Sequence, residues 1–205
     1  MSGNLASQTG ARVLARAAGA WPLIALALLL AFNAVFTPGF ASIEVRDGRL
    51  FGAMVNVLKN GSIVVLLATG MTLVIASGGI DLSVGSVMAL SGTVAALCLT
   101  LVGWPVGLCV LGGLAAGVAV GMFNAALVQS VGLQPIIATL VTLVAGRGIA
   151  QTLTHDQKVR FENTSFEWIG TGAVGGVPTP ILIAVVVVGL VLVLLRVTVL
   201  GMYVE

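Results

Sequence analysis

The sequence predicts an all-α protein, a polytopic transmembrane helical bundle. Of its 205 residues, 59% are hydrophobic and only 8% are charged, whereas a soluble domain carries about 25% charged residues. The mean hydropathy is +1.16, and apolar runs that suit a hydrocarbon core of about 30 Å recur along the chain. The formal net charge of +2 is too small to indicate nucleic-acid binding. We therefore expect most of the chain to lie in a lipid bilayer.

Six membrane spans are expected, separated by polar turns and loops. Residues 1–20 form a polar tail, and residues 21–196 form the transmembrane domain. Trp21 opens the first span at a position typical of an interfacial aromatic residue. The longest polar segments are the connection 37–60 and the loop 154–176. The expected spans cover residues 21–36, 61–76, 84–102, 106–128, 136–153 and 177–195.

The basic residues give conflicting indications of orientation. Arg12 and Arg16 in the tail favour a cytoplasmic N-terminus, because cytoplasmic loops carry an excess of Lys and Arg. With six spans, however, five further basic residues would then face outward, which the same rule disfavours. These residues are Arg46, Arg49, Lys59, Lys158 and Arg160.

A break with an acidic residue at its centre precedes the third expected span. An ionised carboxylate on a lipid-facing helix costs about 2.5–3.5 kcal/mol at the centre of the bilayer, and irregular backbone at that depth needs protein or water around it. Two roles for Asp81 stay open: it caps the third span by accepting backbone N–H groups, or it lines a polar pathway through the bundle. The residues of the break are Ser77, Gly78, Gly79, Asp81, Ser83 and Gly85.

Two other polar residues lie within expected spans. We interpret Asn124 as a helix–helix hydrogen-bonding residue, with a substrate contact as the alternative. Arg147 needs a carbonyl or carboxylate partner, and Asp81 is one candidate. A stripe of glycines four residues apart also predicts close packing of a second helix, with a substrate groove as the alternative. The stripe consists of Gly113, Gly117 and Gly121.

The sequence lacks the residue patterns expected for metal binding, nucleotide hydrolysis or intramembrane catalysis. His155 has no second His or Cys nearby, so we expect no metal site, and no Walker pattern predicts nucleotide hydrolysis. An intramembrane enzyme would need a second carboxylate or a Ser/His pair at depth, and neither is visible. A broken helix with an aspartate is also typical of secondary transporters driven by an ion gradient. That class is therefore kept as an alternative.

The run ATGMTLVIASGGIDLSVGSVMAL at 68–90 resembles the membrane-spanning subunits of bacterial ATP-driven sugar importers of the ribose, xylose and galactofuranose type. Residues 79–85 carry the most recognisable part of this resemblance. Ala125 and Ile136 depart from the family's usual residues and leave the sugar open. Further similar segments are 123–124, 127–128, 134–135, 138–140, 147–148, Pro180 and 201–205, and segments 47–52 and 144–148 resemble the galactofuranose permease branch in particular.

The resemblance implies the permease subunit of an ABC-type sugar importer, which forms the translocation pathway for a monosaccharide. It implies a bacterial cytoplasmic (inner) membrane location, a cytoplasmic N-terminus, and residues 197–205 as the start of a cytoplasmic coupling region. The implied partners are a cytoplasmic ABC ATPase, a periplasmic sugar-binding protein and a second permease subunit, identical or related. ATP and Mg are used by the ATPase, and no cofactor is expected here. Members of the family are longer, so we expect an N-terminal portion.

Overall fold

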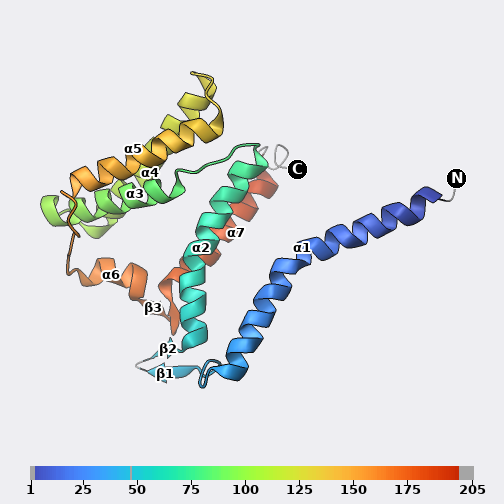
Figure 1. Cartoon of the computed structure of the whole chain (residues 1–205). Coiled ribbons are helices and arrows are strands. Elements are labelled where there is room, and N and C mark those ends of the chain that lie inside the picture. The colour runs from blue at the N-terminus through green and yellow to red at the C-terminus, as the bar shows by residue number, and fades with distance from the viewer. Residues whose placement is uncertain (1–2, 47, 199–205) are drawn as a thin grey trace. The chain divides into compact units, whose positions relative to one another are not determined.

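The computed structural model describes residues 3–46 and 48–198 (Figure 1). The chain divides into two compact units, Met1–Val57 and Leu58–Glu205. Nearly all regular structure is helical, with two short antiparallel hairpins among the described residues, which confirms the predicted all-α class. The expected coupling region at 197–205 lies, from residue 199 onward, outside the described residues.

The first unit holds one long helix and a hairpin. Helix α1 (Gly3–Phe36) includes most of the expected polar tail together with the first expected span. The strands β1 (Glu44–Arg46) and β2 (Arg49–Phe51) pair antiparallel, with Val45 opposite Leu50. Helix α2 (Ala53–Ala76) begins in this unit. The expected polar connection 37–60 is therefore partly hairpin and partly helix.

The second unit contains the remaining elements. Helix α3 continues into a short π-helix, η1, which Gly103 ends with a left-handed backbone (φ 71°). Pro105 and Pro135 stand at the starts of the next two helices, where the missing proline N–H costs no helical hydrogen bond. The elements are α3 (Val84–Leu97), η1 (Cys98–Val102), α4 (Val106–Gln129), α5 (Pro135–Leu153), α6 (Thr164–Thr171), β3 (Ala173–Val174), β4 (Val177–Pro178) and α7 (Thr179–Val197).

Five helices among the described residues, rather than the predicted six, are long and apolar enough to cross a membrane. They are α2, α3 with η1, α4, α5 and α7. The first expected span falls in the apolar part of α1, Ala20–Phe36, which is shorter. At about 1.5 Å per residue it spans about 26 Å, less than the hydrocarbon core of about 30 Å.

Two predicted boundaries were wrong. Helix α2 begins at Ala53 rather than residue 61, because the polar residues around Lys59 are helical and do not interrupt it. The loop 154–176 is also partly ordered: the Asn163 side chain accepts the Phe166 N–H (3.1 Å) and caps α6, and α6 packs against α7. The break before the third span is confirmed, since α2 ends at Ala76 and α3 begins at Val84.

Helices α3, α4 and α5 form the packed core of the second unit. Helix α4 runs antiparallel to α3, because Asn124 near its end meets Ser83, whereas Gly113 near its start meets Ser91. Helix α5 runs parallel to α3, with Thr139 beside Ile80. The start of α3 therefore lies between the end of α4 and the start of α5.

Candidate transport site

The break between α2 and α3 is built by small residues. Gly78 has a left-handed backbone (φ 79°), which favours glycine, and its N–H donates to Ile75 O (2.9 Å). The Gly79 N–H donates to Val74 O (2.9 Å), and the Ser77 hydroxyl donates to the same oxygen (2.8 Å). These bonds use the last carbonyls of α2 and let the chain leave the helix without orphaned acceptors.

Asp81 is tied to the start of α3 through Ser83. One carboxylate oxygen of Asp81 accepts the Ser83 N–H (2.7 Å) and the Ser83 hydroxyl (2.6 Å). Asp81 is half-buried, and Ser83, the N-cap residue of α3, is fully buried. Of the backbone donors expected at 82–85, the described contacts of this carboxylate include only Ser83. The carboxylate therefore closes a local turn with the N-cap residue of α3, and both roles of Asp81 stay predictions.

A buried chain of hydrogen bonds continues from Ser83 across all three core helices. The Asn124 amide N–H of α4 donates to the Ser83 hydroxyl oxygen (3.0 Å), and the Asn124 carbonyl oxygen accepts the Thr142 hydroxyl of α5. Ser83, Asn124 and Thr142 are all buried. Ser86 adds a bond to Ser83 O (2.8 Å). We call Asp81, Ser83, Asn124 and Thr142 the polar joint.

Small residues let α5 approach the polar joint. A Cβ added at Gly146 would lie 3.2 Å from the Ser86 side chain, a tight contact that glycine avoids. The Thr139 hydroxyl lies 3.3 Å from Ile80 O and 2.9 Å from Pro135 O of its own helix. Our sequence analysis missed Thr139, Thr142 and Gly146. Their spacing of three and four residues along α5 was the available signal, because it places them on one helix face.

Arg147 lies apart from Asp81. The described residues contain no ion pair between them, so the candidate pairing proposed from the sequence was wrong. The reason is geometric: Thr139 marks the level of the break, and Arg147 follows eight residues later, about 12 Å further along α5.

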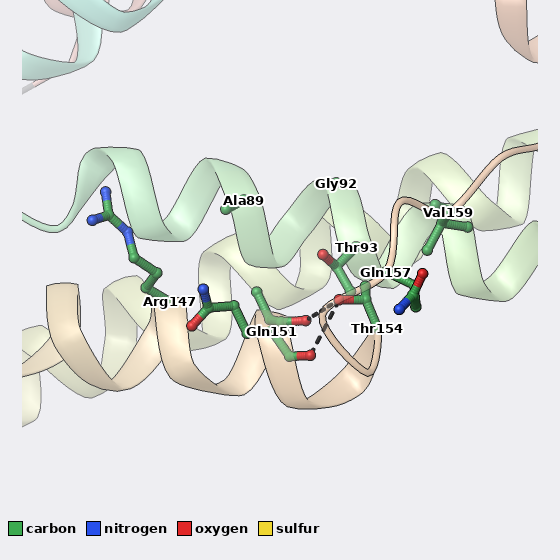
Figure 2. A pocket seen from close by; sticks show the side chains of 10 residues that line it. Ala89, Gly92, Thr93, Arg147, Gln151, Thr154, Gln157 and Val159 are labelled. Atoms are coloured by element: carbon green, nitrogen blue, oxygen red, sulfur yellow. Dashed lines mark hydrogen bonds between the residues drawn. The ribbon is translucent and has the colours of Figure 1, made fainter.

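Arg147 instead lines a hollow of about 350 Å³ between α3 and the second half of α5. Figure 2 shows Thr93 on α3, Arg147 and Gln151 on α5, and Gln157 on the segment that follows. That segment turns back through two left-handed residues, His155 (φ 50°) and Asp156 (φ 55°). We call this feature the α3–α5 hollow.

The glycine stripe of α4 is only partly used for packing against α3. A Cβ at Gly113 would lie 2.8 Å from the Ser91 carbonyl oxygen, and one at Gly117 would lie 3.1 Å from the Ser91 hydroxyl. A Cβ at Gly121, like one at Gly85, would meet no atom within 4 Å among the described residues. Close approach of α3 and α4 therefore explains two of the three glycines.

Five apolar helices and a polar joint at the break define the chain as a polytopic helical membrane protein. It belongs to the family described as "Branched-chain amino acid transport system / permease component", which matches residues 53–205. No solved structure shows a significant match.

Three of the similar proteins are sugar permeases. The galactofuranose transporter permease protein YtfT of Escherichia coli is 43% identical over 190 residues, covering 90% of this chain and 55% of the relative. The fructose import permease protein FruF of Bifidobacterium longum is 40% identical over 191 residues, covering 90% and 53%. The ribose import permease protein RbsC of Escherichia coli is 40% identical over 165 residues, covering 78% and 48%. The chain thus spans about half the length of these relatives.

Proposed function

We propose that this chain forms the translocation pathway in the permease part of an ATP-driven monosaccharide importer. The observation that carries the proposal is the 43% identity to a galactofuranose permease over 90% of the chain. The fructose and ribose import permeases among the relatives support a sugar as the class of substrate. Galactofuranose and ribose-like sugars are the first candidates.

The packing suggests how such a pathway would work. The polar joint ties α3, α4 and α5 together through buried hydrogen bonds, so the three helices would move as one body. The break at 77–83 separates this body from α2 and offers a place for the chain to bend. A cytoplasmic ABC ATPase would supply the energy with ATP and Mg, and a periplasmic binding protein would deliver the sugar. A second permease subunit would complete the pathway.

We place the permease in the cytoplasmic membrane with its N-terminus inside, so that α6 and the loop around it face the periplasm. Single cysteines at Thr164 and Ser130, with Cys98 and Cys109 replaced, test this orientation. Both positions are exposed. A membrane-impermeant thiol reagent should label Thr164→Cys in whole cells and leave Ser130→Cys unlabelled until the cells are opened. The reverse pattern would invert the orientation.

Uptake measurements test the function itself. Cells that express the complete transporter should take up at least one of D-galactofuranose, D-ribose, D-fructose and D-xylose. An inactive ATPase should abolish that uptake, and an ionophore that collapses the proton gradient at constant ATP should not. Uptake that survives without the ATPase and stops with the ionophore would instead establish the ion-gradient alternative.

A further inference from the structure

Thr93 differs from the threonines of α2, η1 and α5. In α2, η1 and α5 every threonine hydroxyl donates to a carbonyl of its own helical stretch. The Thr93 hydroxyl makes no hydrogen bond within the described part of the chain, and its side chain lines the α3–α5 hollow (Figure 2). A threonine in a helix normally satisfies its hydroxyl by bonding back to a carbonyl. This hydroxyl is therefore left available to another molecule.

Three further polar side chains at the hollow share this property. Arg147 and Gln151 lie four residues apart on α5, and Gln157 follows the reversing turn (Figure 2). None of their side chains has a hydrogen bond or ion pair within the described residues. Together with Thr93, the four residues come from three segments and line the same hollow.

Such side chains do not belong against lipid. Arg147 lies six residues before the end of α5, and Gln151 lies one turn further. Charged and polar groups at such depth face the protein interior or a water-filled cavity. The α3–α5 hollow is therefore expected to be wet in the assembled transporter.

We infer that the α3–α5 hollow is a binding site for the hydroxyl groups of the transported sugar. This inference rests on the proposed function and adds the residues that contact the sugar. Sugar hydroxyls both donate and accept hydrogen bonds, and amide and hydroxyl side chains do the same, whereas Arg147 only donates. The volume of about 350 Å³ falls at the lower end of the range typical of small-molecule sites, about 300–1,000 Å³.

A neutral polyol suits this lining better than an acidic side chain from another segment. A carboxylate accepts hydrogen bonds and would use the Arg147 guanidinium, but it would leave the acceptor oxygens of Gln151 and Gln157 without donors. The site also lies at the end of α5 from which α6 and its loop follow. In the proposed orientation this is the periplasmic end, where the binding protein releases the sugar.

A matched pair of substitutions tests the inference in the complete transporter. Thr93→Val removes the unpartnered hydroxyl without changing the shape of the side chain. Thr152→Val removes an exposed hydroxyl that bonds to Gly148 O and does not line the hollow. The measurement is ATP-driven uptake of the sugar identified above and of its monodeoxy analogues, under conditions that saturate the binding protein.

Thr93→Val should lower the maximal uptake rate about fivefold, the effect of one lost hydrogen bond. For one deoxy analogue the rates of wild type and Thr93→Val should be equal, because that analogue lacks the hydroxyl which Thr93 binds. Thr152→Val should match the wild type for every sugar. A Thr93→Val variant that slows all analogues equally, or none, would overturn the inference.

Cysteine protection supplies a measurement that does not depend on turnover. Gln151→Cys, with Cys98 and Cys109 replaced, should react with an impermeant thiol reagent from the periplasm. The identified sugar, added with its binding protein and an ATPase that binds but cannot hydrolyse ATP, should slow that reaction at least fivefold. Thr152→Cys serves as the control and should show no protection.

A Gln151→Cys variant that never reacts would show a hollow filled by protein, and equal rates with and without sugar would show a cavity that does not bind it. Either result overturns the inference. The two proposals fail in different ways. If the wild-type transporter takes up no sugar with its ATPase, the proposed function fails. If it transports and these variants behave like their controls, only the sugar site fails.

Discussion

The two ends of the α3–α5 pair differ in how their polar groups are used. At the first end, Ser83 and Thr142 are buried and bonded to each other through Asn124. At the second end, Thr93, Arg147, Gln151 and Gln157 have side chains without a hydrogen-bond or ion-pair partner in the described structure, whereas the Thr154 hydroxyl beside them bonds to carbonyls of α5. From Thr139 to Gln151 the helix rises by about 18 Å, so both arrangements occur on the same two helices.

The polar joint is a satisfied structural network, whereas the unpartnered polar groups of the α3–α5 hollow are free to bind a ligand. A buried polar group without a partner costs about 1–3 kcal/mol, so the satisfied joint holds α3, α4 and α5 in one arrangement. The unpartnered polar groups of the hollow remain able to form hydrogen bonds with a transiently bound ligand. A transported substrate must bind well enough to enter and weakly enough to leave. A few hydrogen bonds from an open site fulfil that requirement better than a closed network does.

The largest expected effect comes from opening the joint at Asp81. Asp81→Leu removes the acceptor of both Ser83 bonds, so the start of α3 should lose its fixed position. We expect uptake by the complete transporter to be abolished while membrane insertion stays normal. Asp81→Asn keeps an acceptor oxygen without the charge and should retain part of the activity. The measurements are sugar uptake and the amount of protein in the membrane fraction.

Normal transport by Asp81→Leu would show that the joint contributes neither structure nor pathway. Equal loss in the Leu and Asn variants, at equal membrane levels, would mean that the charge and not the accepted hydrogen bonds is required. That outcome would assign Asp81 a role in the pathway rather than a structural role in the polar joint.

The next effect comes from separating α3 from α4 with a single methyl group. In Gly113→Ala the new Cβ would lie 2.8 Å from the Ser91 carbonyl oxygen, which is backbone and cannot turn away. Overpacking of this kind costs about 1–3 kcal/mol. The measurement is the midpoint of thermal unfolding in detergent, which should fall.

Gly121→Ala is the matched control on the same helix. Outside its own helix backbone, no described atom lies within 4 Å of its added Cβ, and alanine is favoured over glycine inside a helix by about 0.5–1 kcal/mol. This variant should therefore unfold at the same temperature as the wild type or slightly higher. A fall in both variants would contradict the packing of α4 against α3 through Gly113.

The sequence was sufficient for the helices with clear ends. The boundaries of α4 and α5 lie within one residue of the predicted ones, because Pro105 and Pro135 mark where a helix starts. The start of α2 was misplaced because Lys59 looked like part of a loop, although a long side chain of this kind can reach the membrane surface from within a helix.

The polar contacts were harder to predict than the helices. Asp81 and Arg147 are the charged residues that stand out in the apolar runs, so pairing them was reasonable from composition. The pairing was wrong because composition does not give the position of a residue along its helix, and Arg147 lies about 12 Å along α5 from the level of the break. The polar joint depends on the hydrogen bond from the Thr142 hydroxyl to Asn124. The sequence alone could not predict this bond, because a threonine hydroxyl can also donate to a carbonyl of its own helix, and the choice depends on the position of α4.

The smallest effect should come from the hydrogen bond between Thr142 and Asn124. The Thr142 hydroxyl can donate to Asn124 Oδ1 or to Ala138 O, which is 3.1 Å away. Thr142→Val and Asn124→Leu, alone and combined, give the coupling free energy of unfolding between the two side chains. Interhelical hydrogen bonds in membranes average about 0.6 kcal/mol and reach about 1.7 kcal/mol, and we expect about 1 kcal/mol here. Thr152→Val combined with Asn124→Leu is the control and should show no coupling. Equal coupling in the two pairs would mean that the Thr142 hydroxyl bonds to its own helix and that the joint ends at Asn124.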